Sequence, residues 1–239
     1  MGPCKVNVLS THPSDFRGTN ALKRALADID APGWCVAFGD RIEMLEAANR
    51  ERYRGRKIVH VGGGETWHNN TLLSHPDHWT RDALSVVSSL HFVANAYAAD
   101  NLVGLGVGME DEPNGGGRVF IVGCPSLDEI VAYAKTLDPN RKRKGIVAWF
   151  PEDHDKTDNT WHPYARQQRK TEFEFLHDIA HCELFRTNSS AGLREAPILG
   201  TPVEMVGSRQ AGRAPAGTYA HPQGRACEEI RRIVLEVCR

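Results

Sequence analysis

The sequence lacks any apolar run long enough to span a membrane. A helix that crosses a bilayer needs about 20 consecutive apolar residues, and none of the 239 residues falls in such a run. The opening residues, Met1–Lys5, also lack the apolar core of a secretory signal peptide. These two absences predict a cytoplasmic protein without a membrane partner.

Closely spaced cysteines are absent as well. The six cysteines lie far apart and form no C-x-x-C pair, which excludes zinc-finger-like sites and is typical of reduced, buried thiols. No H-E-x-x-H motif occurs, and the histidines at His75–His78 and His154-Asp155 have no fixed ligand spacing. We therefore expect neither a metal nor a cofactor.

Neither sign of charge is in excess. Lys and Arg total 29, Asp and Glu total 30, and the net charge is −1. This balance excludes a protein that coats nucleic acid through bulk positive charge. The apolar fraction of 41% and the charged fraction of 25% are those of a folded globular protein. A chain of this length forms one large domain or two small ones.

Strand-like and helix-like patterns alternate along the first half of the chain. Short apolar runs predict strands at 5–9, 35–38, 57–61, 90–93 and 119–122, with helical patterns at 20–28, 41–50, 78–87 and 95–105. Such alternation is typical of a parallel sheet with helices on both faces. A helix over 126–137 follows, which Ser126 and Glu129 would begin with a capping box.

A second α/β domain is expected after the polar stretch 138–144. Strands are predicted at 146–150, 184–187 and 203–206, and helices at about 166–182 and 226–237. We therefore place a first Rossmann-like domain at residues 1–138 and a second at 139–239, whose last helix could cross back to the first. Ligands of such sheets bind beyond the carboxyl ends of the strands, so the two domains are expected to face a cleft there.

Acidic residues follow two strands of the first domain. Asp40 comes after Gly39, and Glu65 comes after three consecutive glycines, so both carboxylates lie at carboxyl ends of neighbouring strands. Such a pair can serve as general base and positioning group. A helix-capping Asp40 and a solvated Glu65 are the alternative. His12, in the turn after the first strand, is a third candidate base.

The segment 188–195 directly follows a strand of the second domain. The hydroxyls of Ser189 and Ser190 and the small residues around them would let backbone N–H groups at a helix start meet a phosphate. Glu195 would lie one turn into that helix, where its carboxylate could accept hydrogen bonds from ribose hydroxyls. The simpler alternative is a helix capped by a serine.

Together these motifs resemble those of the hydrolysing UDP-N-acetylglucosamine 2-epimerases. The resemblance runs in chain order through 39–45, 59–65, 90–94, 122–128, 188–195, 200–202 and 207–213. It implies a GT-B arrangement, in which two Rossmann-like domains hold a UDP-sugar between them. It also implies that Asp40 and Glu65 face the sugar. The nucleotide-sugar-binding residues that it implies are Ser189, Ser190, Gly192, Glu195, Arg209 and Arg213.

The sequence departs from this family at two places near the expected reaction centre. Pro13 stands where the family has an arginine, and Phe150-Pro151 stands where the family has a His-Pro pair. A nucleotide site that is kept beside a changed reaction centre suggests changed chemistry.

Aromatic and basic residues in loops after strands suggest an acceptor site. These residues are Trp67, Trp161, Tyr164, Arg166 and Arg169. Aromatic faces beside guanidinium groups can stack bases or sugars. With the changed centre, they favour a glycosyltransferase that moves a sugar from a UDP-sugar to an acceptor hydroxyl, for which a hydroxymethylated base in DNA would be suitable. The alternatives are a retained hydrolysing 2-epimerase and an inactive UDP-sugar-binding protein.

Overall fold

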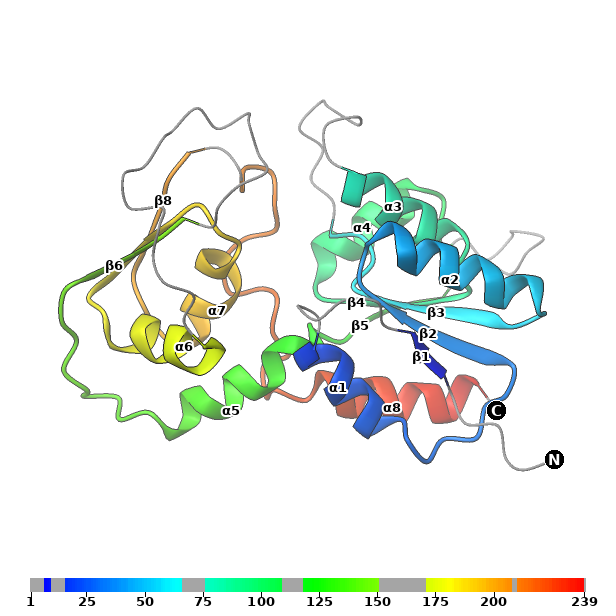
Figure 1. The fold of residues 1–239 in the computed structure, drawn as a ribbon, viewed down its shortest axis with the longest axis horizontal. Coiled ribbons are helices and arrows are strands. Elements are labelled where there is room, and N and C mark those ends of the chain that lie inside the picture. The colour runs from blue at the N-terminus through cyan, green and yellow to red at the C-terminus, as the bar shows by residue number, and fades with distance from the viewer. Residues whose placement is uncertain are drawn as a thin grey trace. The chain divides into compact units, whose positions relative to one another are not determined.

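The computed structural model describes residues 7–9, 16–65, 76–108, 118–150, 171–207 and 210–238 (Figure 1). The chain forms two compact units, of which the first comprises Met1–Asp128 and Tyr219–Arg239 and the second comprises Glu129–Thr218. The division comes before the predicted boundary at residue 138. The chain returns to the first unit over Tyr219–Arg239, which agrees with the expectation that the last helix could cross back.

The first unit is built on a five-stranded parallel sheet in the order β1-β2-β3-β4-β5. Its strands are β1 (Asn7–Leu9), β2 (Trp34–Phe38), β3 (Lys57–Val61), β4 (Leu90–Val93) and β5 (Arg118–Ile121). Its helices are α1 (Phe16–Ala25), α2 (Ile42–Tyr53), α3 (Pro76–Val86), α4 (Ala96–Gly104) and α8 (Ala226–Val237). The alternation predicted for this half of the chain is therefore present.

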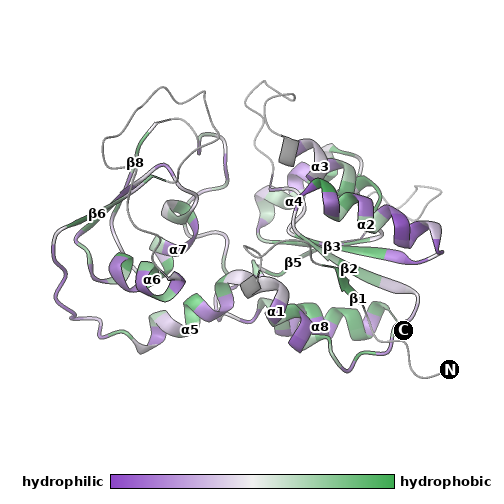
Figure 2. Ribbon diagram, viewed as in Figure 1, coloured by the Kyte–Doolittle hydropathy of each residue, from purple (hydrophilic) through white to green (hydrophobic). Residues whose placement is uncertain are grey.

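Helices cover both faces of this sheet, which explains why its strands read as nearly continuous apolar runs. On β2, Val36 and Phe38 pack in one cluster with α1 and α8, whereas Cys35 and Ala37 pack with α2 and α3. This split follows from the two-residue period of a strand. Figure 1 shows α1 and α8 on one side of the sheet and α2, α3 and α4 on the other. In Figure 2 the central strands are hydrophobic, and the far end of α2 is hydrophilic.

The apolar stripe of α8 explains why the end of the chain belongs to the first unit. Ile230, Ile233 and Val234 are buried in the same core cluster as Leu22 of α1 and Leu26, the residue after it. The carboxylate of Asp128 accepts hydrogen bonds from the backbone N–H of Ala226 (3.0 Å) and of the next residue (2.9 Å), which caps the first turn of α8.

The second unit contains a three-stranded parallel sheet in the order β6-β7-β8. Its strands are β6 (Ile146–Trp149), β7 (Leu184–Thr187) and β8 (Val203–Met205), and its helices include α6 (Glu172–His181) and α7 (Ala191–Ile198). Helix α5 (Asp128–Thr136) begins at the last residue of the first unit's main segment. None of the helices in the described ranges is long and apolar enough to cross a membrane.

Two helix starts differ from the sequence prediction. The capping box expected at Ser126 is wrong, because Pro125–Leu127 forms a short 3-10 helix and the Ser126 hydroxyl lies 3.0 Å from Cys124 Sγ. Helix α6 begins at 172 rather than near 166. There Thr171 and Glu174 form a capping box that satisfies two N-terminal amides.

The basic stretch before β6 ties together the ends of two helices in the second unit. Arg141 donates from Nε to the carbonyl of Ala180 (2.8 Å) and from Nη2 to the carbonyl of Leu199 (2.5 Å). These carbonyls lie at the ends of α6 and α7, where helical acceptors lack intrahelical partners. Arg141 is therefore a structural residue of the second unit.

Candidate functional site

An ion pair joins the end of β2 to helix α3 in the first unit. Gly39, with φ of 110°, turns the chain out of β2, and the carboxylate of Asp40 then pairs with the guanidinium of Arg81. Asp40 does not cap the next helix, because Arg41 occupies the N-cap position of α2. The capping alternative for Asp40 is therefore wrong.

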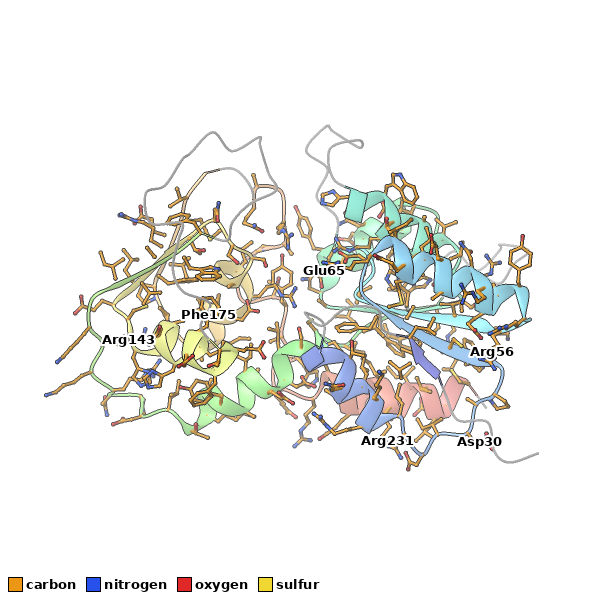
Figure 3. All side chains as sticks on the ribbon, viewed as in Figure 1. Asp30, Arg56, Glu65, Arg143, Phe175 and Arg231 are labelled. Atoms are coloured by element: carbon orange, nitrogen blue, oxygen red, sulfur yellow. The ribbon has the colours of Figure 1, made fainter. Side chains whose placement is uncertain are left out.

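The same guanidinium reaches the end of β3. Arg81 also donates a hydrogen bond to the backbone carbonyl of Glu65, so one guanidinium holds the carboxylate of Asp40 and the main chain of Glu65. The Glu65 side chain is half-buried and lies at the edge of the first unit where β3 ends (Figure 3). No sequence pattern marked Arg81 as a site residue. The available signal was a basic residue on the helix that follows two acids at neighbouring strand ends.

The glycines before Glu65 have a packing reason. A Cβ on Gly64 would lie 2.0 Å from the carbonyl oxygen of Ala98, and its φ of 72° is one that other residues rarely adopt. Asn101 of α4 donates to the Gly64 carbonyl at 2.8 Å. The triple glycine thus lets α4 approach the loop closely and fixes the backbone that leads to Glu65.

Two histidines lie buried beside this ion pair, and the sequence analysis missed both. His60 on β3 and His91 on β4 are register partners in the sheet, and their rings meet edge to face with centroids 6.3 Å apart. Burial lowers the pKa of His60 from 6.5 to about 3 and that of His91 to about 4, because an imidazolium loses its hydration there. Both rings are therefore neutral at physiological pH.

The basic cluster that precedes β3 is structural. Arg54 and Arg56 pair with the buried carboxylate of Glu51 at 2.7 and 2.6 Å. Figure 3 shows Arg56 at the opposite end of the sheet from Glu65. A buried carboxylate needs such partners because its desolvation is otherwise unfavourable.

In the second unit, a tight turn joins β7 to α7. Thr187 Oγ1 accepts from the backbone N–H of Ser189 at 3.0 Å, and Ser189 Oγ accepts from the N–H of Ala191 at 3.3 Å. Ser190 occupies the N-cap position but makes no side-chain capping bond. A Cβ on Gly192 would lie 2.5 Å from Met205 Sδ, so this glycine lets α7 pack directly against the strands.

Three buried acceptor atoms on α7 and on the segments that precede and follow it have no hydrogen-bond partner among the described residues. They are Oε2 of Glu195, Oδ1 of Asn188 and Oε1 of Gln210. Gln210 is held by its own amide, which donates to the Asn188 carbonyl at 2.8 Å, and the N–H of Arg213 donates to the Gln210 carbonyl at 3.3 Å. A buried acceptor without a donor is unfavourable by about 1–3 kcal/mol. A ligand that carries hydroxyl or N–H donors would remove that penalty.

Several predicted site residues lie outside the described residues. These are His12, Trp67, Trp161, Tyr164, Arg166, Arg169 and Arg209. The acceptor site expected from the aromatic and basic loops therefore stays a prediction. Within the described ranges, no group of three or more His, Cys, Asp or Glu side chains is placed to hold a metal ion.

Comparison with known proteins gives a consistent picture. The family model described as UDP-N-acetylglucosamine 2-epimerase matches residues 16–175. The UDP-N-acetylglucosamine 2-epimerase of Neisseria meningitidis serogroup B is 25% identical over 82% of this chain. A hydrolysing UDP-N,N'-diacetylbacillosamine 2-epimerase of Legionella pneumophila is 34% identical over 49% of it. The matches span 61% and 28% of those two relatives, respectively.

Solved structures show the same fold. The Neisseria meningitidis enzyme bound to UDP-GlcNAc superposes with a TM-score of 0.64 at 14% identity, over 92% of this chain and 81% of that one. A Methanocaldococcus jannaschii UDP-GlcNAc 2-epimerase in complex with UDP-GlcNAc and UDP gives 0.59 at 16% identity, over 95% and 82%. These likenesses confirm the predicted α/β class with Rossmann-like domains.

Proposed function

This chain belongs to the UDP-N-acetylglucosamine 2-epimerase family, and we propose that it is a hydrolysing 2-epimerase of a UDP-N-acetylhexosamine. The family match favours this alternative over the glycosyltransferase that the departures from the family motifs suggested. The residues expected to bind a DNA acceptor lie outside the described residues and give the transferase no support.

The observation that carries the proposal is the buried carboxylate oxygen of Glu195, one turn into α7, which has no hydrogen-bond partner among the described residues. A ribose offers two adjacent hydroxyl donors, which are the groups that such an oxygen requires. The turn at Ser189 and Ser190 precedes the helix and offers a diphosphate the positive end of the helix dipole and the Ser190 hydroxyl, which makes no capping bond. The second unit is thus proposed to bind UDP.

The chemistry requires an acid–base group near C2 of the sugar. A base removes the C2 proton, the C1–O bond breaks with its electron pair going to UDP, and a C1=C2 double bond forms. Water then adds its hydroxyl to C1 while C2 takes a proton on the opposite face. The sum is one UDP-N-acetylglucosamine and one water converted to N-acetylmannosamine and UDP.

We assign these roles in the first unit to the residues around Arg81. Glu65 is the proposed base, because its half-buried side chain follows β3 while its own carbonyl is fixed by Arg81. Asp40 is the proposed positioning group, because its carboxylate is engaged with the Arg81 guanidinium. Phe150, which stands where the resemblance implies a histidine, is buried and cannot transfer a proton. Departure of UDP is therefore assigned to the positive end of the α7 dipole and to the Ser190 hydroxyl.

Binding and turnover can be tested separately. Replacing Glu195 with alanine should weaken UDP binding by about 1–3 kcal/mol in calorimetry, the range for a charge-assisted hydrogen bond. Glu204→Ala is the matched control, because Glu204 lies in the same unit with an exposed carboxylate that pairs with Arg186. Equal UDP affinities for these two variants would contradict the assignment of the nucleotide site.

Turnover then tests the base. Glu65→Gln should lower the release of UDP from UDP-N-acetylglucosamine by about 10²-fold or more while UDP still binds, because the amide keeps the shape and removes the proton acceptor. Asp40→Asn should lower it less, because it weakens one interaction of Arg81. Full activity in Glu65→Gln would place the base elsewhere, with His12 as the next candidate.

A further inference from the structure

The imidazole of His60 connects the two backbones that carry the Asp40–Arg81 ion pair. His60 is fully buried on β3. Its Nε2 lies 3.3 Å from the carbonyl oxygen of Gly39, the residue before Asp40. Its Nδ1 lies 3.0 Å from the hydroxyl of Ser85, which is one helical turn after Arg81 on α3. The ring of His60 therefore contacts the segment that carries Asp40 and the helix that carries Arg81.

The partners of the ring fix its tautomer. The ring is neutral, so it has one N–H donor and one acceptor nitrogen. The Gly39 carbonyl can only accept, which places the proton on Nε2. Nδ1 must then accept from the Ser85 hydroxyl. Ser85 Oγ also lies 2.9 Å from the Arg81 carbonyl and could donate to it, with Nδ1 carrying the ring proton. Nε2 would then face the Gly39 carbonyl without a proton, so the Nε2–H tautomer is the one that satisfies both contacts of the ring.

The contact between His60 and Ser85 requires a glycine at position 63. A Cβ on Gly63 would lie 2.9 Å from His60 Nδ1 and 3.0 Å from Ser85 Oγ, which is closer than side-chain carbons approach such atoms. The missing side chains of this loop therefore leave room for two contacts. Gly64 leaves room for helix α4, and Gly63 leaves room for the His60–Ser85 hydrogen bond.

We propose that His60 and Ser85 are positioning residues for the Asp40–Arg81 pair, and this inference rests on the proposed function. Both ends of the pair stand at the carboxyl edge of the sheet, on a turn and on a helix. The buried His60–Ser85 bond sets the distance between that turn and that helix. Without it, Arg81 can shift away from Asp40 and from the Glu65 carbonyl, and the base is no longer held in place.

A pair of serine variants isolates this effect. Ser85→Ala removes the hydroxyl that bonds His60. Ser88→Ala is the matched control, because Ser88 is a buried serine two residues after α3 whose hydroxyl donates only to a carbonyl one turn back, that of Leu84 at 2.7 Å. With UDP-N-acetylglucosamine, Ser85→Ala should lower kcat about tenfold, the lower end of what misplaced catalytic groups lose, without changing the UDP dissociation constant. Ser88→Ala should retain the wild-type kcat.

Two replacements of His60 test whether its hydrogen bond, and not only its packing, supports activity. His60→Asn can place an amide oxygen near the position of Nδ1 and accept from Ser85, so it should keep more activity than His60→Leu. Equal kcat losses in Ser85→Ala and Ser88→Ala, or equal losses in the two His60 variants, would show that these residues act through packing and would overturn the proposal.

Nitrogen NMR of the histidine side chains tests the contact without any turnover. Wild-type His60 should remain the Nε2–H tautomer from pH 8 to pH 5, with Nδ1 shifted by its hydrogen bond, and Ser85→Ala should remove that shift. An Nδ1–H tautomer in the wild type would overturn the proposal. If the tautomer is as expected but no UDP-sugar is turned over, the proposed function fails and the contact stands as a structural one.

Discussion

The two buried histidines should make the protein markedly less stable in mild acid. In the unfolded chain each imidazole titrates near 6.5, whereas in the folded protein burial lowers the pKa of His60 to about 3 and of His91 to about 4. As pH falls below 6.5, the unfolded chain therefore binds two protons that the folded protein does not. Stability from these groups is complete above pH 6.5 and declines as pH falls toward the folded values.

The size of the effect follows from the span between pH 6.5 and pH 5. At about 1.4 kcal/mol per pH unit, each histidine contributes a loss of roughly 2 kcal/mol at pH 5, so the pair contributes about 4 kcal/mol. That is a large share of the 5–15 kcal/mol that is typical of a folded domain. Urea unfolding at pH 7 and pH 5 measures the total change.

A variant separates the histidines from other titrating groups. His60→Asn removes one of the two groups, so its loss of stability between pH 7 and pH 5 should be about 2 kcal/mol smaller than that of the wild type. His177→Gln is the control for replacing a histidine outside the buried pair, because His177 is exposed on α6. The reasoning is refuted if His60→Asn and the wild type lose the same free energy of unfolding.

Three further predictions concern stability and are checked by thermal or urea unfolding. Arg141→Ala should destabilise the second unit by about 1–3 kcal/mol because the Ala180 carbonyl of α6 loses its Arg141 donor and the Leu199 carbonyl keeps only the longer bond from Arg143, at 3.4 Å, whereas Lys142→Ala, at an exposed neighbour, should have little effect. Gly64→Ala should destabilise by at least about 2 kcal/mol, because strain at positive φ adds to a clash with α4. Asp128→Ala should remove the cap of α8 and destabilise by about 1 kcal/mol. An Arg141→Ala protein as stable as Lys142→Ala would show that the two carbonyls are satisfied in another way.

The fold could be predicted from the sequence because most of its signals are local. The strands at Leu90–Val93 and Leu184–Thr187 were placed with the observed bounds, since a short apolar run between polar turns marks a buried parallel strand. The division between the units was harder. The polar stretch before β6 looks like a linker, but Arg141 uses it to tie helices within the second unit.

The site likewise combines residues that local sequence patterns indicate with contacts that depend on the folded chain. Asp40 and Glu65 follow glycines at strand ends, which is a signal within a few residues of sequence. The partnership with Arg81 joins residues 41 positions apart, and no local pattern specifies it. His60 and His91 appear in the sequence as interruptions of apolar strands. Their pairing across the sheet and the bond to Ser85 depend on register and on the packing of α3, which the sequence did not supply.

Turnover of UDP-N-acetylglucosamine in deuterium oxide tests the central claim most directly. A hydrolysing 2-epimerase exchanges the C2 proton with solvent, so the account predicts UDP together with N-acetylmannosamine that carries deuterium at C2. Mass spectrometry and proton NMR of the released sugar measure both. Release of UDP with N-acetylglucosamine that retains its C2 proton, or no release of UDP from this or another UDP-N-acetylhexosamine, would contradict the account.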